Sequence, residues 1–282
     1  MSVAADSIRD QQRIIWDQFA AGWRKWDAEL LAWHGPFGAA LIEEARLHPR
    51  SSVLDVASGT GEPGLTAAAL VPDGHVVLTD ISAGMLKVAE AKAVARGLQN
   101  VRFEVCDAAA LPLEDESFDA VFCRFGFNFF PAIGPALREM FRTARPGARI
   151  TAAVWGRAAE NPWASLIQGT LAHHTELPPP PAGTPGLFRY SAAGLMSRMF
   201  RDAGLVDVTE RRASTDLVKA SPELYWEFMT EIATTVAAGL AQTDREAREL
   251  IRSDVFQLLG RYEHDGAIRL RSTATIVAGT RG

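Results

Sequence analysis

The segment VLDVASGTGEPG, residues 53–64, constrains the fold of this chain more than any other stretch. It opens with apolar residues rich in β-formers, and glycines follow at positions 59, 61 and 64. Glycine lets a chain turn sharply, and it lets a ligand approach bare backbone amides at the positive N-terminus of the following helix. The segment therefore predicts a strand, a tight ligand-binding turn and a helix in succession.

The same alternation of strand and helix continues along the chain. Strand-like runs cover residues 52–58, 75–80, 101–107, 118–125 and 148–155, and helical patterns of about 10–15 residues separate most of them. Two later runs, 205–214 and 271–280, also alternate like strands. Strands joined by helical crossovers form a parallel sheet covered on both faces. We therefore expect an α/β, Rossmann-like fold with a seven-stranded, mostly parallel sheet, helices on both faces and a helical cap or lid.

Helical patterns without intervening strands occupy both ends of the chain. Residues 7–33 carry aromatic side chains three and four apart, and residues 35–47 form a second helical segment ahead of His48-Pro49. Further helical patterns and a proline-rich loop at 177–186 follow Trp155. We expect an N-terminal helical cap over 1–48, a cofactor-binding core over 49–156, and helical lid insertions with the last two strands of the same sheet over 157–282. Within the last region, segments 161–200 and 222–259 are the expected lid.

Composition narrows the class of partner. The 282 residues carry a formal net charge of -5 with 29 Lys and Arg, and no cluster of basic residues indicates nucleic-acid binding. A small-molecule partner is expected, and a homodimer stays open. Two cysteines, Cys106 and Cys123, without metal-ligand spacing indicate neither a disulfide framework nor a metal site. The chain shows no signal-like start and no long apolar run, so we expect no membrane span and a cytoplasmic location.

Two aspartates at strand ends distinguish between adenosine cofactors. Asp80 ends its strand where a carboxylate can accept two hydrogen bonds from a ribose diol, a role that NAD-binding enzymes share. Asp107 ends the next strand beside Ala108 and Ala109, where it can accept a bond from an adenine amino group. Neither this second acid nor Asp55 in the first strand belongs to the dinucleotide fingerprint. The pattern therefore favours another adenosine cofactor.

Four segments carry a resemblance to a known family. VLDVASGTGEPGL, VVLTDISAGMLKVAEAKA, NVRFEVCDAAALPLEDESFDAVFCRFGFNFF and REMFRTARPGARITAAVW, in this order, resemble the class I S-adenosylmethionine-dependent methyltransferases. Within that family they are most similar to the branch around the ubiquinone/menaquinone C-methyltransferases. The resemblance covers about residues 50–156 well and the ends loosely. It implies S-adenosyl-L-methionine as cofactor and S-adenosyl-L-homocysteine as product.

The resemblance also implies roles for individual residues. Asp80 would hold the ribose hydroxyls, and Asp107 with Ala108 would take the adenine edge. The family's N-terminal aromatic-Asp-x-x-Ala-x-x-Tyr pattern ends here in tryptophan, so Trp23 would act only as an apolar lid. The full set of implied cofactor-binding residues is Trp23, Ala57, Gly59, Thr60, Gly61, Asp80, Ile81, Met85, Asp107, Ala108, Arg124 and Phe125.

The cofactor brings its own electrophile, so no dedicated nucleophile is required. A hydroxyl or carbon-acid acceptor would benefit from a base, and the candidates are His34, His173 and His174. The last two end the helix after the fifth strand, near the expected substrate mouth, whereas His34 fits a helix junction equally well. Asn128 is a candidate for orienting a polar acceptor. The aromatic run at 124–130 fits core packing and recognition alike.

Three functions stay open at this level. The first is methyl transfer from S-adenosylmethionine to a small, largely apolar or aromatic molecule, by O- or C-methylation, in quinone or specialised metabolism. The second is a cofactor-binding protein that steers a non-methylating reaction or a partner chain. The third is an NAD-dependent oxidoreductase, which accounts for the glycines and Asp80 but leaves Asp55 and Asp107 unexplained.

Overall fold

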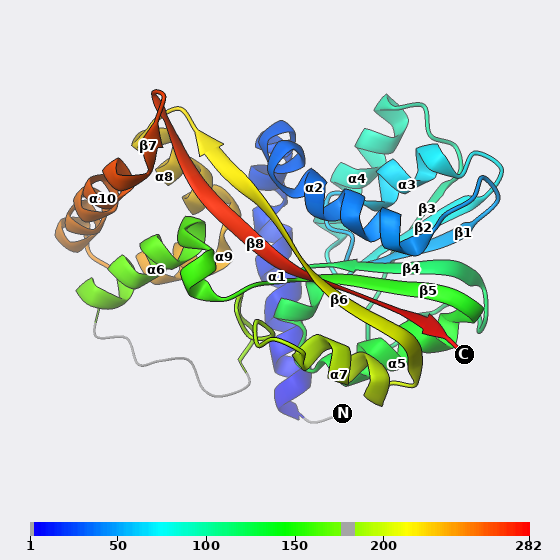
Figure 1. Ribbon diagram of the computed structural model, residues 1–282. Helices are drawn as coiled ribbons and strands as arrows, with labels where there is room; N and C mark the ends of the chain where they lie inside the picture. The colour runs from blue at the N-terminus through cyan, green and yellow to red at the C-terminus, as the bar shows by residue number, and fades with distance from the viewer. Residues whose placement is uncertain (1–2, 176–183) are drawn as a thin grey trace.

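A computed structural model describes residues 3–175 and 184–282, and its centre is one twisted sheet (Figure 1). The strands follow the order β3-β2-β1-β4-β5-β8-β6, and β7 pairs with β8 outside this path. Strands β1 to β5 pair in parallel, whereas β8 runs antiparallel to both β5 and β6. The strands are β1 (Ser52–Val56), β2 (His75–Asp80), β3 (Val101–Val105), β4 (Phe118–Arg124), β5 (Ala144–Trp155), β6 (Leu205–Lys219), β7 (Glu263–His264) and β8 (Ala267–Arg281). The expected α/β fold with a mostly parallel sheet is confirmed.

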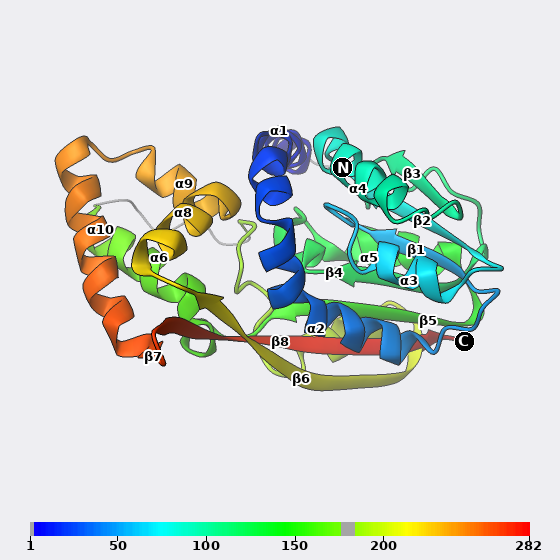
Figure 2. The same cartoon turned by 90° about the horizontal axis from the view of Figure 1, so that it is seen from above.

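Helices cover both faces of this sheet. In Figure 1, α2, α3 and α4 lie above it and α5 and α7 below it. Figure 2 shows α1 standing between the sheet and the separate group of α8, α9 and α10. The helices are α1 (Val3–Lys25), α2 (Asp27–Ala45), α3 (Gly64–Leu70), α4 (Ala83–Ala95), α5 (Ile133–Thr143), α6 (Pro162–His174), α7 (Leu195–Asp202), α8 (Pro222–Ile232), α9 (Thr234–Leu240) and α10 (Arg245–Leu259).

The N-terminal helices divide at a different place from the one the sequence predicts. The expected junction at His34-Gly35 is wrong, because α2 continues through Gly35 and Pro36 to Ala45. The break lies instead at Trp26, which separates α1 from α2. An internal proline costs a helix about 3 kcal/mol. Burial of Phe37 and Leu41 offsets that cost, since both are completely excluded from solvent. His34 therefore sits inside a continuous helix.

Strands β6 and β8 extend well beyond the edge of the parallel sheet. Each has 15 residues, and their pairing continues from Leu205 with Arg281 to Lys219 with Ile268. Figure 1 shows both strands crossing from the sheet to the helices α6, α8 and α10. The sequence predicted shorter strands, 205–214 and 271–280, and the structure extends both towards the helical segment between them. Helices far from the sheet are thus attached to its own strands.

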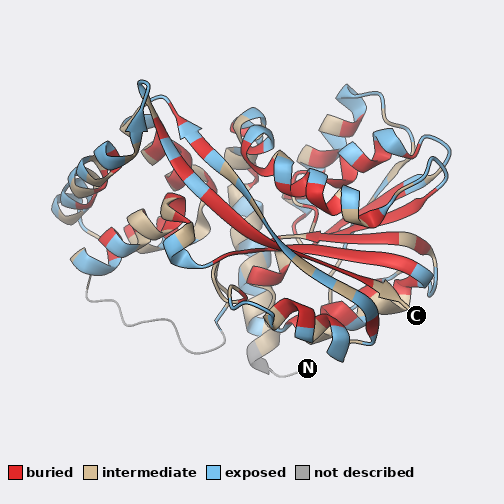
Figure 3. Ribbon diagram, viewed as in Figure 1, coloured by how far each residue is buried: buried red, intermediate tan, exposed pale blue. Residues whose placement is uncertain are grey.

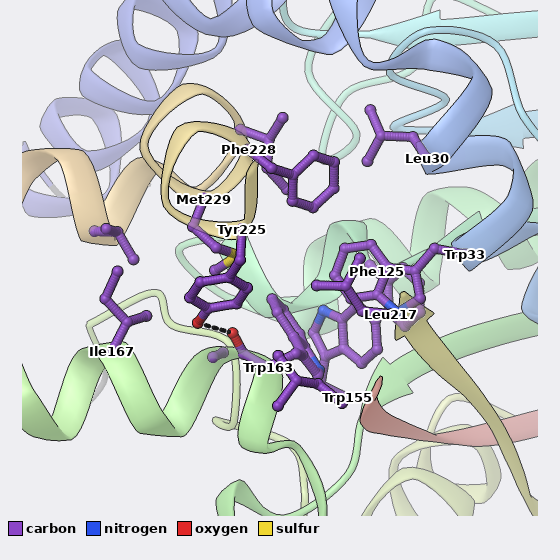
Figure 4. Packing of buried hydrophobic residues seen from close by; sticks show 14 of the residues in the cluster. Leu30, Trp33, Phe125, Trp155, Trp163, Ile167, Leu217, Tyr225, Phe228 and Met229 are labelled. Carbon is purple, nitrogen blue, oxygen red and sulfur yellow. Dashed lines mark hydrogen bonds between the residues drawn. The ribbon is translucent and has the colours of Figure 1, made fainter. Parts of the chain in front are cut away.

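A hydrophobic core fills the space between these extended strands and the distant helices (Figures 3 and 4). Tyr225, Phe228 and Met229 of α8 are fully buried. The hydroxyl of Tyr225 donates to the backbone carbonyl of Trp163 in α6 over 2.7 Å, and Phe228 meets Trp33 of α2 with ring centroids 5.9 Å apart. This packing holds α6 and α8 against α2.

Two further expectations concern the proline-rich loop within the lid and the absence of a membrane span. Residues 177–183 of the proline-rich loop, which are also part of the lid segment 161–200, lie outside the described residues. Within residues 3–175 and 184–282, no helix combines the length and apolar character needed to cross a membrane.

Candidate active site

One cavity opens at the carboxyl ends of the parallel strands, where α1 and the helices beyond β5 meet the sheet. Open α/β sheets bind ligands at this edge. Of the implied cofactor-binding residues, all but Thr60 and Gly61 line the cavity: Trp23, Ala57, Gly59, Asp80, Ile81, Met85, Asp107, Ala108, Arg124 and Phe125. The structure therefore brings together residues of α1, α4, the ends of β2 and β4, and the loops that follow β1 and β3, which the sequence separates widely.

The glycine turn has the shape that a close-approaching ligand requires. Gly59 has φ +54°, and a Cβ built there would meet nothing within 4 Å, so its exposed side faces open space. Gly61 has φ +103°, and its Cβ would lie 2.6 Å from Leu65 Cδ1. Gly61 thus serves close packing beneath the turn, whereas Gly59 leaves room in the cavity. Ala57 adopts φ +56°, an unusual conformation for a residue with a side chain.

Asp80 is fixed by backbone amides on both sides. The N–H of Gly59 donates to Oδ2 over 2.8 Å, and that of Ser82 donates to Oδ1 over 2.9 Å. Burial raises the pKa of Asp80 to about 6, against the opposing effect of these amides. Each oxygen of an ionised carboxylate has capacity for a further donor. A ribose diol fits this arrangement.

Asp55 is the acid that interrupts the first strand, and it lies under the glycine turn. Its side chain is completely buried, and Oδ2 accepts from the N–H of Gly64 over 2.8 Å. Oδ1 has no hydrogen-bond partner among the described residues. Burial raises the pKa of Asp55 to about 7, while the nearby guanidinium of Arg124 acts in the opposite direction. Asp55 therefore ties β1 to α3 without facing the cavity.

Asp107 has a partner that the sequence did not reveal. Its Oδ1 accepts from the N–H of Ala109 over 2.9 Å, and its Oδ2 accepts from Arg9 Nη1 over 2.6 Å. Arg9 lies on α1 and lines the cavity together with Gln12 and Trp16. No local pattern predicts a contact between residues 98 positions apart. The first turns of α1 thus cover the part of the cavity expected to take adenine.

Asp17 fixes α1 to the loop that carries Asp80. Its Oδ1 accepts from the hydroxyl of Ser82 over 2.6 Å and from the N–H of Gly84 over 2.9 Å. Ser82 in turn accepts from the N–H of Met85 and caps α4. Asp17 is the aspartate of the N-terminal aromatic-Asp-x-x-Ala family pattern. The pattern identified the residue, but it did not indicate that Asp17 joins α1 to the loop before α4.

Replacement of Asp17 by alanine is expected to lower the free energy of unfolding by about 1–2 kcal/mol, because two donors at the N-terminus of α4 lose their acceptor. Denaturant unfolding would measure this change. Asp10→Ala on the same helix is a suitable control, since the Asp10 side chain is 68% exposed. Equal effects of the two substitutions would contradict the proposed anchoring of α1.

The inner end of the cavity is aromatic. Phe125 stacks on Trp155 with centroids 3.9 Å apart and planes 4° apart, and Trp163 meets Trp155 at 4.7 Å. The aromatic run at 124–130 divides between two roles: Phe125, Phe129 and Phe130 line the cavity, while Phe127 is buried in the core. The N-terminal tryptophans divide similarly. Trp16, Trp23 and Trp33 line the cavity, whereas Trp26 packs on Phe228.

Of the three candidate bases, the structure brings only His34 to the cavity wall. His34 is 4% exposed, and burial holds its pKa well below the usual range, with the charge of Arg124 as a smaller cause. His173 and His174 lie at the end of α6, outside the cavity lining, and His174 Nε2 lies 2.6 Å from Asp254 Oδ2. Asn128 is also outside the lining, and its amide donates to the carbonyl of Leu187.

Cys106 also lines the cavity, but burial raises the pKa of its thiol to about 12, so it is protonated at neutral pH. Within the described part of the chain, no three His, Cys, Asp or Glu side chains gather as a metal site.

Part of this chain is similar in sequence to known methyltransferases. A family model described as a methyltransferase domain matches residues 53–147. The demethylmenaquinone methyltransferase of Thermus thermophilus is 38% identical over 135 residues, which are 48% of this chain and 51% of that protein. The ubiquinone/menaquinone biosynthesis C-methyltransferase UbiE of Hahella chejuensis is 41% identical over 111 residues, 39% of this chain and 45% of that protein. The chain spans about half the length of the curated relatives it matches.

Solved structures show the same fold over most of the chain. The YcgJ protein from Bacillus subtilis aligns with a TM-score of 0.56 at 20% identity, covering 86% of this chain and 97% of that one. Geranyl diphosphate C-methyltransferase from Streptomyces coelicolor aligns with a TM-score of 0.51 at 15% identity, covering 88% and 79%. The sequence matches therefore identify residues 53–147 as a methyltransferase domain, and this part of the chain is similar to demethylmenaquinone and ubiquinone/menaquinone C-methyltransferases.

Proposed function

We propose that this protein transfers a methyl group from S-adenosylmethionine to an oxygen or carbon atom of a small, largely apolar or aromatic molecule, in quinone or specialised metabolism. The observation that carries this proposal is the single cavity that joins two unlike halves. One half presents Asp80, Asp107 and the glycine turn, and the other presents stacked aromatic rings. A polar adenosine group and an apolar acceptor fit these halves respectively.

In this proposal the cofactor half binds by complementarity of polar groups. Asp80 accepts from the ribose hydroxyls, and Asp107 with Ala108 takes the adenine edge, while Ile81 and Met85 pack on the ring. Both acids are already oriented by backbone amides, so little reorganisation accompanies binding. Bound S-adenosylmethionine supplies a methyl group on a cationic sulfonium.

The aromatic half would position the acceptor and receive the positive end of the cofactor. Phe125 lies between the two halves, at the end of β4 and against Trp155. Aromatic faces attract a nearby cation by roughly 0.5–2 kcal/mol. Holding the acceptor in line with the methyl group can supply roughly 7–11 kcal/mol of the barrier. The protein's contribution is therefore mainly position and environment.

Calorimetric titration with S-adenosylmethionine, S-adenosylhomocysteine and NADH in parallel tests the cofactor. We expect micromolar binding of both sulfur nucleotides and none of NADH, and binding of NADH alone would refute the proposal. Mass spectrometry of a panel of phenols and hydroquinones incubated with S-adenosylmethionine then tests transfer. Tight cofactor binding without methylation of any acceptor would favour a protein that steers a different reaction.

A further inference from the structure

We propose that His34 receives the proton of an acceptor hydroxyl group during methyl transfer, while the aromatic end of the cavity holds the flat ring that carries this group. The inference rests on the proposed function and adds the acceptor's reacting group and the residue that ionises it.

His34 has no hydrogen-bond partner among the described residues. It lies inside α2, is 4% exposed and lines the cavity, yet neither Nδ1 nor Nε2 bonds to any of the described residues. A buried polar group without a partner destabilises the folded state, so it calls for an explanation such as an ordered water or a ligand. Both nitrogens are buried in the protein alone, and an imidazole with two unpaired nitrogens beside a cavity has the capacity to bind a ligand hydroxyl that reaches it.

Three indole groups that line the cavity already have hydrogen-bond acceptors. The N–H of Trp23 donates to Ile232 O over 3.1 Å, that of Trp33 to Ser272 Oγ over 2.7 Å, and that of Trp163 to Asn161 Oδ1 over 2.9 Å. These rings therefore offer only their apolar surfaces to a ligand. An acceptor hydroxyl group therefore cannot pair with these three indoles, whereas the nitrogens of His34 have no partner among the described residues.

A side chain must be uncharged on one ring nitrogen before it can accept a proton there, as the imidazole of His34 is. Burial keeps the imidazole neutral, with its pKa well below the usual range, and a neutral imidazole has a nitrogen that can accept a proton. An isolated imidazolium would be disfavoured there. During the reaction, however, the sulfonium loses its positive charge as the imidazolium gains one, so the total charge of the cavity does not change.

The aromatic rings around His34 favour a cation at that moment, against the opposing charge of Arg124. Its ring lies 4.2 Å from Trp33, 5.3 Å from Phe125 and 5.5 Å from Trp155 between centroids. Electron-rich faces around the imidazole attract its protonated form. The same stack that we place beside the sulfonium thus stabilises the positive charge at both of its positions.

The reaction moves one proton and one methyl group. The acceptor O–H bond breaks and its proton moves to a nitrogen of His34, the S–CH3 bond of the cofactor breaks, and a bond forms between the methyl carbon and the acceptor oxygen. S-adenosylhomocysteine leaves as a neutral thioether, and His34 later releases the proton to water. Methylation at the adjacent ring carbon follows the same ionisation, with the ring proton then leaving to water and the oxygen regaining its own.

A pair of matched probes tests the hydrogen bond without requiring turnover. Binding of 2-naphthol and of 2-methylnaphthalene to the S-adenosylhomocysteine complex would be measured for the wild type, His34→Phe and His34→Gln. We expect the wild type to prefer 2-naphthol by about 2- to 10-fold, the range for one neutral hydrogen bond. The preference should vanish in His34→Phe and persist in part in His34→Gln, which keeps a polar side chain.

Turnover of 2-naphthol provides a second readout. We expect His34→Phe to lower kcat by about 10²- to 10⁴-fold, the range for loss of a general base, with little change in KM. Free imidazole should restore part of the rate of His34→Ala, which leaves a space for it. Intact S-adenosylhomocysteine binding by the variants shows that they are folded.

The role of His34 and the proposed function can be refuted separately. An unchanged preference for 2-naphthol in His34→Phe, with cofactor binding intact, would overturn the role of His34 and leave the proposed function standing. A wild type that binds no S-adenosylhomocysteine would overturn both.

Discussion

Replacement of Asp80 by alanine is expected to weaken binding of S-adenosylmethionine by about 10- to 100-fold, since hydrogen bonds to an ionised group contribute roughly 1.5–3 kcal/mol. The carboxylate accepts from Gly59 N and Ser82 N and so also orients the glycine turn. Calorimetry on purified wild type and variant would measure the change in Kd.

Asp80→Asn is the matched control for this experiment. It has nearly the same shape and keeps one carbonyl oxygen, so it should retain more affinity than Asp80→Ala. Unchanged binding in Asp80→Ala would exclude the ribose-binding role, and equal loss in both variants would place the whole effect in the negative charge.

The stability of the wild type relative to Asp55→Asn is expected to fall by a few kcal/mol as the pH rises from about 4 to about 7. Burial raises the pKa of Asp55 to about 7 in the folded protein, from an ordinary value of 3.8. Between these values the folded state binds more protons than the unfolded state, so its stability decreases with rising pH. Asparagine does not titrate, and the difference between the two proteins isolates this carboxyl group.

The comparison with Asp55→Asn is needed because the titration of His34 changes the stability of the folded protein in the opposite direction. Its pKa is lowered by burial, so the unfolded state binds more protons below about pH 6.5 and stability rises towards that pH. Urea unfolding of wild type and Asp55→Asn at pH 5, 6 and 7.5 would separate the two contributions. A difference that does not depend on pH would show that Asp55 is ionised in the folded protein throughout.

The cofactor half of the cavity was predictable because its information is local. The strand, the glycine turn and the aspartates at strand ends occur in short segments, and the geometry of a parallel sheet brings strand ends to one edge. Thr60 and Gly61 were implied by the family resemblance, yet they lie outside the cavity lining. The division into regions 1–48, 49–156 and 157–282 stays a prediction.

The contacts of α1 and α2 were not predictable in the same way. Arg9 with Asp107 and Asp17 with Ser82 join residues far apart in the chain, and no spacing rule encodes them. Gly35-Pro36 carries a local signal for a break, but burial of Phe37 and Leu41 overrides it. For the same reason, the sequence slightly favoured His173 and His174, whereas only His34 lines the cavity, because the distance of each side chain from the cavity depends on tertiary packing.

Strand β8 carries both halves of the cavity. At one end it pairs with β5 inside the sheet, and at the other it extends to the helices α6 and α8. Near its middle, Ser272 accepts from the Trp33 indole, and the N–H of Thr273 donates to Asn161, which in turn holds Trp163. One strand therefore sets the spacing between the two halves of the cavity. A change in the register of β8 against β5 would displace Trp33 and Trp163 relative to the glycine turn, without any change in the residues that line the cavity.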